Sequence, residues 1–145
     1  MKPLLLGMNN PISDDPEFDL YPYPEGSAGW RLWKMLPEQI SRKQYLDMFE
    51  RQNLLHARSW SQPAAREAAQ VLMPKLAGRL VIILGSQVRA ALGLPISEPL
   101  MFQRTTSPVS YDWVPVPHPS GRNLWYNNPG NRGQVGAMLM ELARR

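Results

Sequence analysis

Leu80-Val81-Ile82-Ile83-Leu84-Gly85 is the clearest strand signal in the sequence. Its five consecutive apolar residues end at a glycine, which predicts a short strand. A strand that is apolar on both faces is typical of a parallel sheet, because helices cover both sides of such a sheet. This run therefore predicts the centre of an α/β fold.

Three other short stretches predict strands that join this one. Leu4-Leu5-Leu6 is apolar and leads into the polar turn Gly7-Met8-Asn9-Asn10-Pro11. Tyr111 to Val116 is a further apolar run, and it leads directly into Pro117-His118-Pro119. Asn53 to Leu55 is shorter, and we interpret it as a brief strand.

Helical segments separate these strands along the chain. Their starts carry residues that cap helices well, and apolar residues recur in them at helical spacing. Pro37 and Gly93 end two of them, since neither residue readily continues a helix. The expected helices run from Ser27 to Leu36, from Ser41, where Gln44 completes a capping box, from Ser61 and Pro63 to Pro74, from Ser86 through Val88 to Leu92, and from Asn131. The first has Trp30, Trp33 and Leu36 on one face, and the second has Tyr45, Leu46 and Phe49 inward. The third has Ala65, Ala68, Ala69 and Leu72 inward, and the last has Val135, Met138, Leu139 and Leu142 inward.

The order of these elements predicts the architecture. Strands that alternate with helices favour a three-layer α/β sandwich, in which helices flank a central, mainly parallel four-stranded sheet. We expect residues 1–145 to form a single domain of this kind, with Pro95 to Pro108 as a loop. The carboxyl ends of parallel strands share one edge, where ligands bind. The turns that hold Asn9-Asn10, Asn53 to His56 and His118-Pro119-Ser120 are therefore expected to meet.

The composition limits the class of protein. Hydrophobic residues make up 43% and charged residues 19% of the chain, as in a soluble globular domain. No apolar run approaches the ~20 residues of a membrane span, and the N-terminus is too weakly apolar for a signal peptide. We therefore expect a cytoplasmic protein, without a membrane partner, that acts as a monomer.

The reactive side chains limit the chemistry further. Cysteine is absent and there are two histidines. Disulfides, thiolate catalysis and iron–sulfur clusters are thereby excluded, and a histidine-rich metal site is not expected. We expect no cofactor, no metal and no iron–sulfur cluster. The net charge of +4 favours a polyanionic partner.

His118 lies in the most constrained turn of the sequence. The prolines on both sides of it restrict the backbone to extended conformations, so its imidazole is a candidate hydrogen-bond donor with a fixed direction. The following Ser120-Gly121-Arg122-Asn123 supplies a hydroxyl, a flexible residue and a cation, which suit a phosphate backbone. The alternative interpretation is a proline-rich surface turn with a solvated or capping histidine.

Five segments of the chain together resemble the uracil-DNA glycosylase superfamily. Leu6-Gly7-Met8-Asn9-Asn10-Pro11 is similar to the Gly-Met-Asn-Pro turn of its single-strand-selective and mismatch-specific branches, and Pro117-His118-Pro119-Ser120-Gly121 is similar to its His-Pro-Ser turn. Three segments between them follow in the family's order: Gly26 to Trp33, Arg51 to Leu55 and Val81 to Gln87. The chain thus resembles a minimal-size member over nearly its whole length.

The resemblance implies a DNA glycosylase, which hydrolyses the N-glycosidic bond of uracil, or of a related deaminated or modified base, in DNA. Such an enzyme flips its target base out of the stack and into a pocket. The resemblance assigns Asn9 to orienting the attacking water and His118 to stabilising the anion of the leaving base. The residues expected to bind the base are Met8, Asn10, Tyr23 and Asn53.

DNA, single- or double-stranded, is the partner that the resemblance implies. Leu124 or Trp125 would fill the space left by the extruded base, whereas Arg31 and Trp33 are expected to build the core of their helix. The residues expected to contact DNA are Ser86, Ser120, Gly121, Arg122, Asn123 and Trp125.

Two positions depart from the family pattern. Asn10 stands where the family has proline, and the stacking aromatic of the family falls at Pro24, so that Tyr23 or Tyr21 must replace it. These departures keep two other functions open. One is a non-catalytic or weakly active relative that binds a modified base in nucleic acid, and the other is an enzyme that acts on a modified pyrimidine in DNA or on a free nucleotide.

Each assigned residue also has a purely structural interpretation. Asparagine is common in turns before proline, so Asn9 could be a turn residue, with Asn10 placing the water instead. Asn53 offers a donor and an acceptor that could tell uracil from cytosine, but a buried asparagine can equally satisfy backbone groups. Tyr23 could pack against the neighbouring prolines. The Asp14-Asp15 pair could supply a general base or cap the loop.

Overall fold

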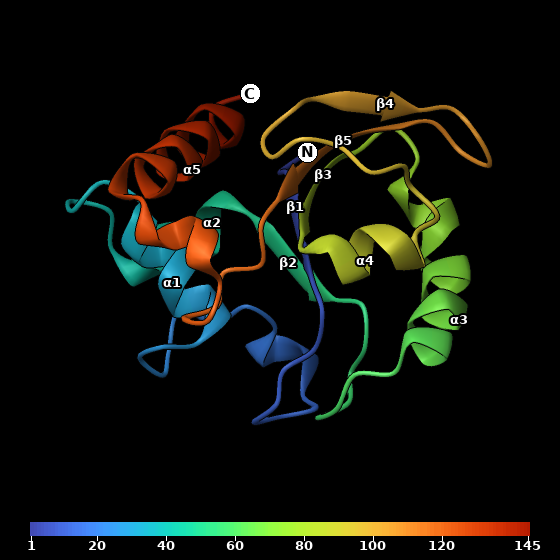
Figure 1. The fold of residues 1–145 in the computed structure, drawn as a ribbon, viewed down its shortest axis with the longest axis horizontal. Helices are drawn as coiled ribbons and strands as arrows, with labels where there is room; N and C mark the ends of the chain where they lie inside the picture. Colours follow the sequence, from blue (N-terminus) through green and yellow to red (C-terminus); the bar gives the residue numbers. More distant parts are fainter.

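A five-stranded sheet with helices on both faces forms the fold (Figure 1). The structure, a computed structural model, describes residues 1–145. The strands are β1 Leu4–Gly7, β2 Glu50–Asn53, β3 Leu80–Leu84, β4 Gln103–Thr105 and β5 Tyr111–Val116. They lie in the order β2-β1-β3-β5-β4, so β3 occupies the centre of the sheet, as its sequence predicts.

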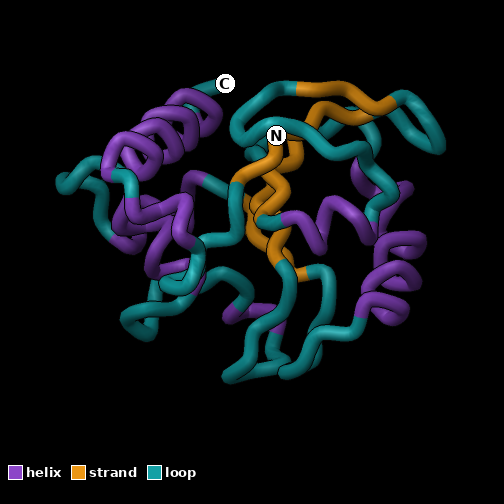
Figure 2. The backbone as a smooth tube through the Cα atoms, viewed as in Figure 1, coloured by secondary structure: helices purple, strands orange, loops and turns teal.

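Four of the strands run parallel, and their carboxyl ends meet at one edge of the sheet. β1 pairs in parallel with β2 and with β3, and β3 pairs in parallel with β5. The register sets Gly7 opposite Asn53 and Leu84 opposite Val116, which are the last residues of their strands. Figure 2 shows the long loops that follow β1 and β2 gathered beyond this edge.

The helices cover both faces of the sheet. They are α1 Ala28–Met35, α2 Arg42–Met48, α3 Gln62–Leu72, α4 Ser86–Ala91 and α5 Pro129–Ala143, with 3-10 helices η1 Pro16–Phe18, η2 Met73–Leu76 and η3 Leu124–Asn127. α1, α2 and α5 lie over one face, and α3 and α4 over the other (Figure 1). The core divides accordingly along β3: Val81 and Ile83 pack on the α3 and α4 side, and Ile82 and Leu84 on the opposite side. None of the helices is both long and apolar enough to cross a bilayer.

The structure confirms the α/β class with a mainly parallel sheet flanked by helices, and it confirms three predicted helix starts. The Ser27 hydroxyl accepts a hydrogen bond from the N–H of Trp30 at the start of α1. Ser41 and Gln44 form the expected capping box of α2, and Ser61 caps α3. Serine side chains thus fix where three of the five helices begin.

The prediction of four strands is wrong, because a fifth strand lies within the stretch expected to be a loop. β4 is a three-residue edge strand that pairs antiparallel with β5 and places Arg104 opposite Asp112. The Arg104 guanidinium donates to the Asp112 carboxylate at 2.8 Å. The sequence of β4 is polar and too short to show a strand period, so only its pairing across the sheet reveals it.

β2 lies earlier in the chain than predicted. It ends at Asn53 instead of beginning there, and its other residues are exposed or half-buried at the edge of the sheet. A polar edge strand lacks the apolar pattern by which strands are identified, which explains the error. The N–H groups of Leu54 and Leu55 still donate to carbonyl groups at the end of β1, so the predicted segment does continue along that strand.

The starts of α4 and α5 also differ from the prediction. Asn128, not Asn131, caps α5, because Pro129 occupies the first turn of the helix, where proline is well tolerated. Ser86 opens α4 but does not cap it. Gly85 holds the capping position with a φ of +101°, a conformation that glycine adopts without strain.

The inward face of α1 differs from the predicted one as well. Gly29, Leu32 and Leu36 are buried along the helix and its C-terminal cap, whereas Trp30 and Trp33 are only half-buried. The cause is the loop that precedes the helix, since a Cβ on Gly29 would lie 2.2 Å from a backbone oxygen of that loop. The loop therefore packs directly on the first turn of α1.

Gly136 on α5 provides a test of how closely α5 packs on α1. A Cβ at Gly136 would lie 1.9 Å from the carbonyl oxygen of Met35, so Gly136→Ala is expected to destabilise the protein by about 1–3 kcal/mol, as overpacking does. Gly133→Ala in the same helix is the matched control. No atom lies within 4 Å of its added Cβ, and we expect stabilisation by about 0.5–1 kcal/mol. Urea unfolding measures both, and equal effects would contradict the packing.

Candidate functional site

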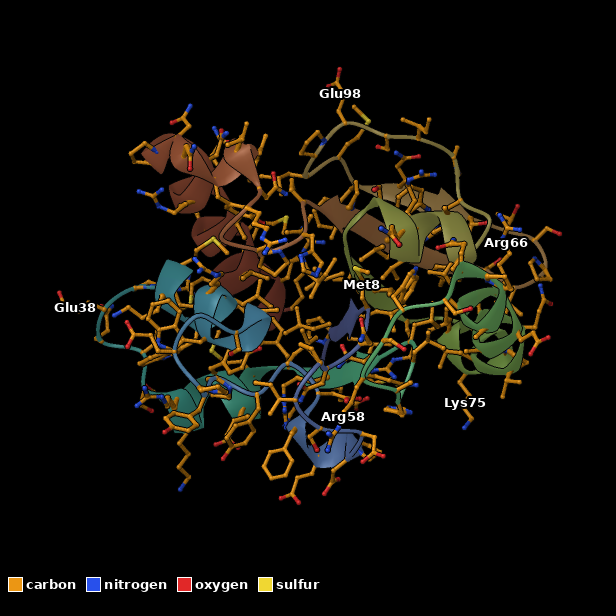
Figure 3. The ribbon with its side chains drawn as sticks, turned by 60° about the horizontal axis from the view of Figure 1, so that its bottom comes forward. Met8, Glu38, Arg58, Arg66, Lys75 and Glu98 are labelled. Carbon is orange, nitrogen blue, oxygen red and sulfur yellow. The ribbon has the colours of Figure 1, made fainter.

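A cavity of about 770 Å³ opens at the carboxyl edge of the sheet. Its walls come from the turns after β1 and β5, the end of β2 and the loop between β1 and α1. Figure 3 turns this end of the molecule forward. The predicted site residues that line the cavity are Asn9, Asn10, Tyr23, Asn53, His118, Ser120 and Gly121. The fold thus brings together side chains from three distant parts of the sequence.

The two adjacent asparagines after β1 are held differently. The Asn9 Nδ2 donates to the carbonyl of Ala57 at 3.1 Å, and its Oδ1 accepts no hydrogen bond from the protein. The Asn10 Oδ1 accepts from the N–H of Ile12 at 2.9 Å, and its Nδ2 donates to the carbonyl of Phe18 at 3.3 Å. Asn10 therefore braces its loop, whereas Asn9 keeps an oriented acceptor beside the cavity.

His118 is fixed through its backbone and leaves its ring free. Its carbonyl accepts hydrogen bonds from the N–H of Ser120 at 2.8 Å and from Asn123 Nδ2 at 3.1 Å. The Tyr126 hydroxyl donates to the carbonyl of the preceding proline at 2.6 Å. A Cβ on Gly85 would lie 3.2 Å from the Cβ of His118, so a glycine there lets the turn sit close to β3. Burial lowers the pKa of His118 below its ordinary 6.5, which favours a neutral imidazole.

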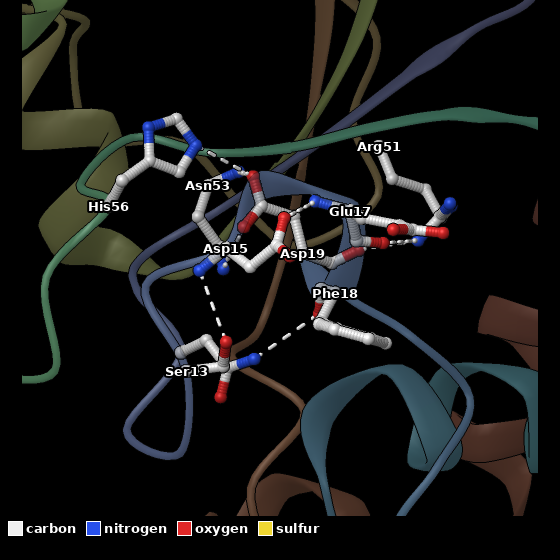
Figure 4. Close-up of polar contacts among 9 residues, drawn as sticks. Ser13, Asp15, Glu17, Phe18, Asp19, Arg51, Asn53 and His56 are labelled. Carbon is white, nitrogen blue, oxygen red and sulfur yellow. Dashed lines mark hydrogen bonds and ion pairs between the residues drawn. The ribbon is translucent and has the colours of Figure 1, made fainter.

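Asp19 joins the cavity loop to the end of β2 (Figure 4). Its carboxylate is buried and accepts hydrogen bonds from the backbone N–H of Asn53 at 2.8 Å and from Asn53 Nδ2 at 3.3 Å. His56 Nε2 lies 2.9 Å from the same carboxylate. Sequence reasoning missed Asp19, because nothing in its acidic loop distinguishes it from Asp14 or Asp15. The Asp15 side chain caps η1, which is one of the two roles considered for that pair.

Asn53 retains a buried acceptor without a partner. Its Oδ1 is inaccessible to solvent and accepts no hydrogen bond. Gly7 lies against this oxygen, since a Cβ there would come within 2.5 Å of it, and the Leu20 side chain lies beside the same position. An unpaired buried acceptor typically costs about 1–3 kcal/mol, so a ligand that supplies an N–H here would recover that free energy.

Leu20 holds the wall of the cavity in a strained conformation. Its φ is +52°, in the left-handed region, which costs a residue with a side chain about 1–2 kcal/mol. The Tyr45 hydroxyl donates to the Leu20 carbonyl at 2.8 Å, and Arg51 donates to the carbonyl of Asp19 at 2.7 Å. Burial raises the pKa of Tyr45, so its hydroxyl remains a donor. Strain that the surroundings maintain in this way is typical of functional sites.

The mouth of the cavity is aromatic and nearly free of charge. Tyr23 is 65% exposed and has no aromatic partner, whereas Tyr21 packs edge-to-face on Phe18 with ring centres 5.4 Å apart. Ile12 is also exposed at the mouth. Glu25 is the single carboxylate among the lining residues, and sequence reasoning did not identify it. No group of three or more histidine, aspartate or glutamate side chains is placed to hold a metal ion.

Five predicted site residues lie outside the cavity lining, and Met8, Ser86 and Arg122 are three of them. Met8 packs against the core between the sheet and α3 and α4, because the side chain after Gly7 turns toward that face. Ser86 is exposed in the first turn of α4. Arg122 is exposed beyond the histidine turn, where its side chain makes no hydrogen bond or ion pair with the protein. The predicted contacts of Ser86 and Arg122 with DNA would therefore lie outside the cavity.

The residues after the histidine turn have structural contacts of their own. The Asn123 side chain donates to the carbonyl of His118 and accepts from the N–H of Trp125, so both ends of its amide hold the turn. Trp125 is half-buried and packs edge-to-face on Tyr126, with ring centres 4.9 Å apart. Leu124 is 78% exposed. Leu124 and Trp125 were the two candidates for filling the space that an extruded base leaves, and Leu124 is the more accessible of them.

Asp19→Ala tests whether the buried carboxylate supports the cavity. The change leaves buried donors of Asn53 without a partner, so we expect a loss of stability on the order of 1–3 kcal/mol for each unpaired group. Asp47→Ala, on an exposed position of α2, removes the same charge and is expected to change stability by less than about 0.5 kcal/mol. Urea unfolding measures both variants. Equal stability of the two would mean that Asp19 does not brace the site.

The lowered pKa of His118 predicts a specific pH dependence of stability. Below pH 6.5 the unfolded chain takes up a proton on this histidine before the folded protein does, so the free energy of unfolding decreases as the pH falls through this range. His118→Gln lacks this contribution, while every other titratable group is common to both proteins. The unfolding free energy of the wild type, minus that of the variant, should therefore decrease as the pH falls below 6.5. A difference that stays constant with pH would contradict the burial of the ring.

No model of a known protein family matches the chain, and no curated protein matches it either. The function of the cavity must therefore be inferred from the chemistry of the residues that line it.

Proposed function

We propose that the protein is a DNA glycosylase that hydrolyses the N-glycosidic bond of uracil in DNA. The observation that carries the proposal is the single cavity lined by Asn9, Asn53 and His118. Its volume of about 770 Å³ lies within the range of small-molecule sites. The three side chains offer what the reaction needs: an acceptor to place water, an amide to read the base and a donor for the leaving group.

His118 stabilises the leaving base. Cleavage of the bond places negative charge on a base oxygen, and a donor held at that oxygen lowers the barrier. Burial lowers the pKa of His118, which favours the neutral imidazole, and a neutral imidazole can donate without transferring its proton. The hydrogen bonds of Asn123 and Tyr126 to the turn support a fixed direction for the donor before the reaction begins.

Asn9 orients the attacking water. Its Nδ2 is held by the carbonyl of Ala57, which leaves Oδ1 to accept a hydrogen bond from water. An amide cannot take up the proton, so the reaction should be slower than with a carboxylate at this position. Glu25 lies exposed at the mouth of the cavity, and we assign it no part in the step.

Asn53 distinguishes uracil from cytosine. Its unpaired Oδ1 needs a donor, and uracil presents an N–H at N3 where cytosine presents an acceptor. A site that hydrogen-bonds its substrate in this way discriminates strongly against analogues that lack the matching group. In the best cases kcat/KM differs by about 10⁴–10⁵-fold. This oxygen is buried beside Gly7 and near the Leu20 side chain, so the proposal requires the cavity wall to open when the base binds.

Two exposed apolar side chains suit base extrusion. Tyr23 is free to stack on the flipped base, a contact worth about 1–3 kcal/mol. Leu124 can enter the space that the base leaves in the stack.

An excision assay tests the proposal directly. Oligonucleotides that carry one uracil, single- and double-stranded, are incubated with the protein, and alkali-labile abasic sites are measured. His118→Ala is expected to lower the rate by about 10²–10³-fold, as the loss of a charge-stabilising donor does, and Asn9→Ala to lower it comparably. Gln70→Ala, which removes an exposed amide from α3, should leave the rate unchanged. Absence of excision by the wild type on either substrate would refute the proposal.

The cavity size favours a second candidate function, the excision or processing of an enlarged, modified pyrimidine in DNA. About 770 Å³ exceeds what an unsubstituted pyrimidine fills. The same assay with an oligonucleotide that carries a bulky 5-substituted pyrimidine separates the two. Faster release of the bulky base than of uracil would support this second function.

A further inference from the structure

A second, smaller hollow of about 180 Å³ lies beside the main cavity. Pro119 and Ser120 line both, so the histidine turn separates the two. Its other walls come from α1, η3 and α5. The residues that line it include Trp30, Arg31, Lys34, Ser120, Tyr126 and Arg132. We call this hollow the basic groove.

Three cations and no carboxylate line the basic groove. None of the ion pairs of the protein involves Arg31, Lys34 or Arg132. Both arginines donate to backbone carbonyl groups, which position their guanidinium groups but leave the charges uncompensated. Lys34 is exposed, and its ammonium lies 5.9 Å from the centre of the Trp30 ring. The groove therefore concentrates positive charge that nothing in the protein neutralises.

Arg31 connects the groove to the mouth of the main cavity. A Cβ on Gly121 would lie 2.7 Å from Arg31 Nη2, so the guanidinium lies directly against the histidine turn. Arg31 was expected to build the core of its helix, but it lines the groove and lies beside Gly121, which lines the main cavity. Like charges that line one hollow repel one another, and a bound polyanion relieves that repulsion.

The groove combines these cations with an aromatic ring. Trp30 is half-buried on α1 and lines the groove together with the arginines. Proteins hold single-stranded nucleic acid with this combination, since cations follow the phosphates and aromatic rings stack on the bases. A strand whose nucleotide occupies the main cavity would reach the groove across the single turn that separates them.

We propose that the basic groove binds the sugar-phosphate backbone of a single-stranded nucleic acid, next to the nucleotide in the main cavity. The inference rests on the proposed function in one respect, because it takes the occupant of the main cavity to be a nucleotide of that strand. A free nucleotide leaves the groove empty, so the polymer binds more tightly than the monomer.

The salt dependence of binding to a uracil-free single-stranded oligonucleotide tests the groove independently of catalysis. Each phosphate contact contributes about 0.7 to the slope of log K against log salt concentration for single strands. Lys34→Gln is expected to reduce the slope by about 0.7, and Lys34→Gln with Arg132→Gln by roughly 1.4. The matched control, Arg66→Gln with Lys75→Gln, removes the same charges from the α3 side, away from α1 and α5 (Figure 3), and should leave the slope unchanged.

The outcomes separate this inference from the proposed function. Equal slopes in the groove variants and the control, or no binding by the wild type, would overturn the groove. Lys34 makes no hydrogen bond to the protein, so its single variant remains informative if the Arg132 change disturbs folding. With a uracil-containing strand, the Lys34 variant should raise KM and leave kcat unchanged. Slope changes without any excision would refute the glycosylase and support the groove, whereas excision with unchanged slopes would do the reverse.

Discussion

Parallel pairing of β1, β2, β3 and β5 is the constraint on which the site depends. Strands that run in one direction end at one edge, so the chain must leave the sheet there each time. The register sets Gly7 beside Asn53, which places the turn after β1 next to the end of β2. The turn after β5 reaches the same edge and carries His118. No local interaction could bring these three segments together, because they are far apart in the sequence.

Buried polar groups then hold the loops at that edge. Asp19 bonds to the end of β2, and the hydroxyls of Tyr45 and Tyr126 each donate to a carbonyl of a cavity loop. Burial raises the pKa of both tyrosines, so they remain donors. The loops are therefore fixed without a ligand, and binding need not supply the free energy to order them.

Features that depend on neighbouring residues could be predicted from the sequence, whereas features that depend on partners far away in the sequence could not. The β3 run and the His118 turn could be identified locally, from consecutive apolar residues and from two prolines. The convergence of the turns followed from strand order alone. Asp19 could not be identified, because its role depends on partners more than thirty residues away at the end of β2. β4 was missed for the same reason, since a polar strand of three residues is defined by its neighbour.

The separation of the cavity from the basic groove has an evolutionary consequence. Under the proposed function, base recognition would belong to the ends of β1, β2 and β5, whereas the cations without ion pairs belong to α1 and α5. If both proposals hold, mutations at the strand ends would alter which base is accepted and leave the cations that bind the polymer in place. A protein built in this way could then acquire a new base preference without first losing its affinity for nucleic acid, because different elements of the fold carry the two functions.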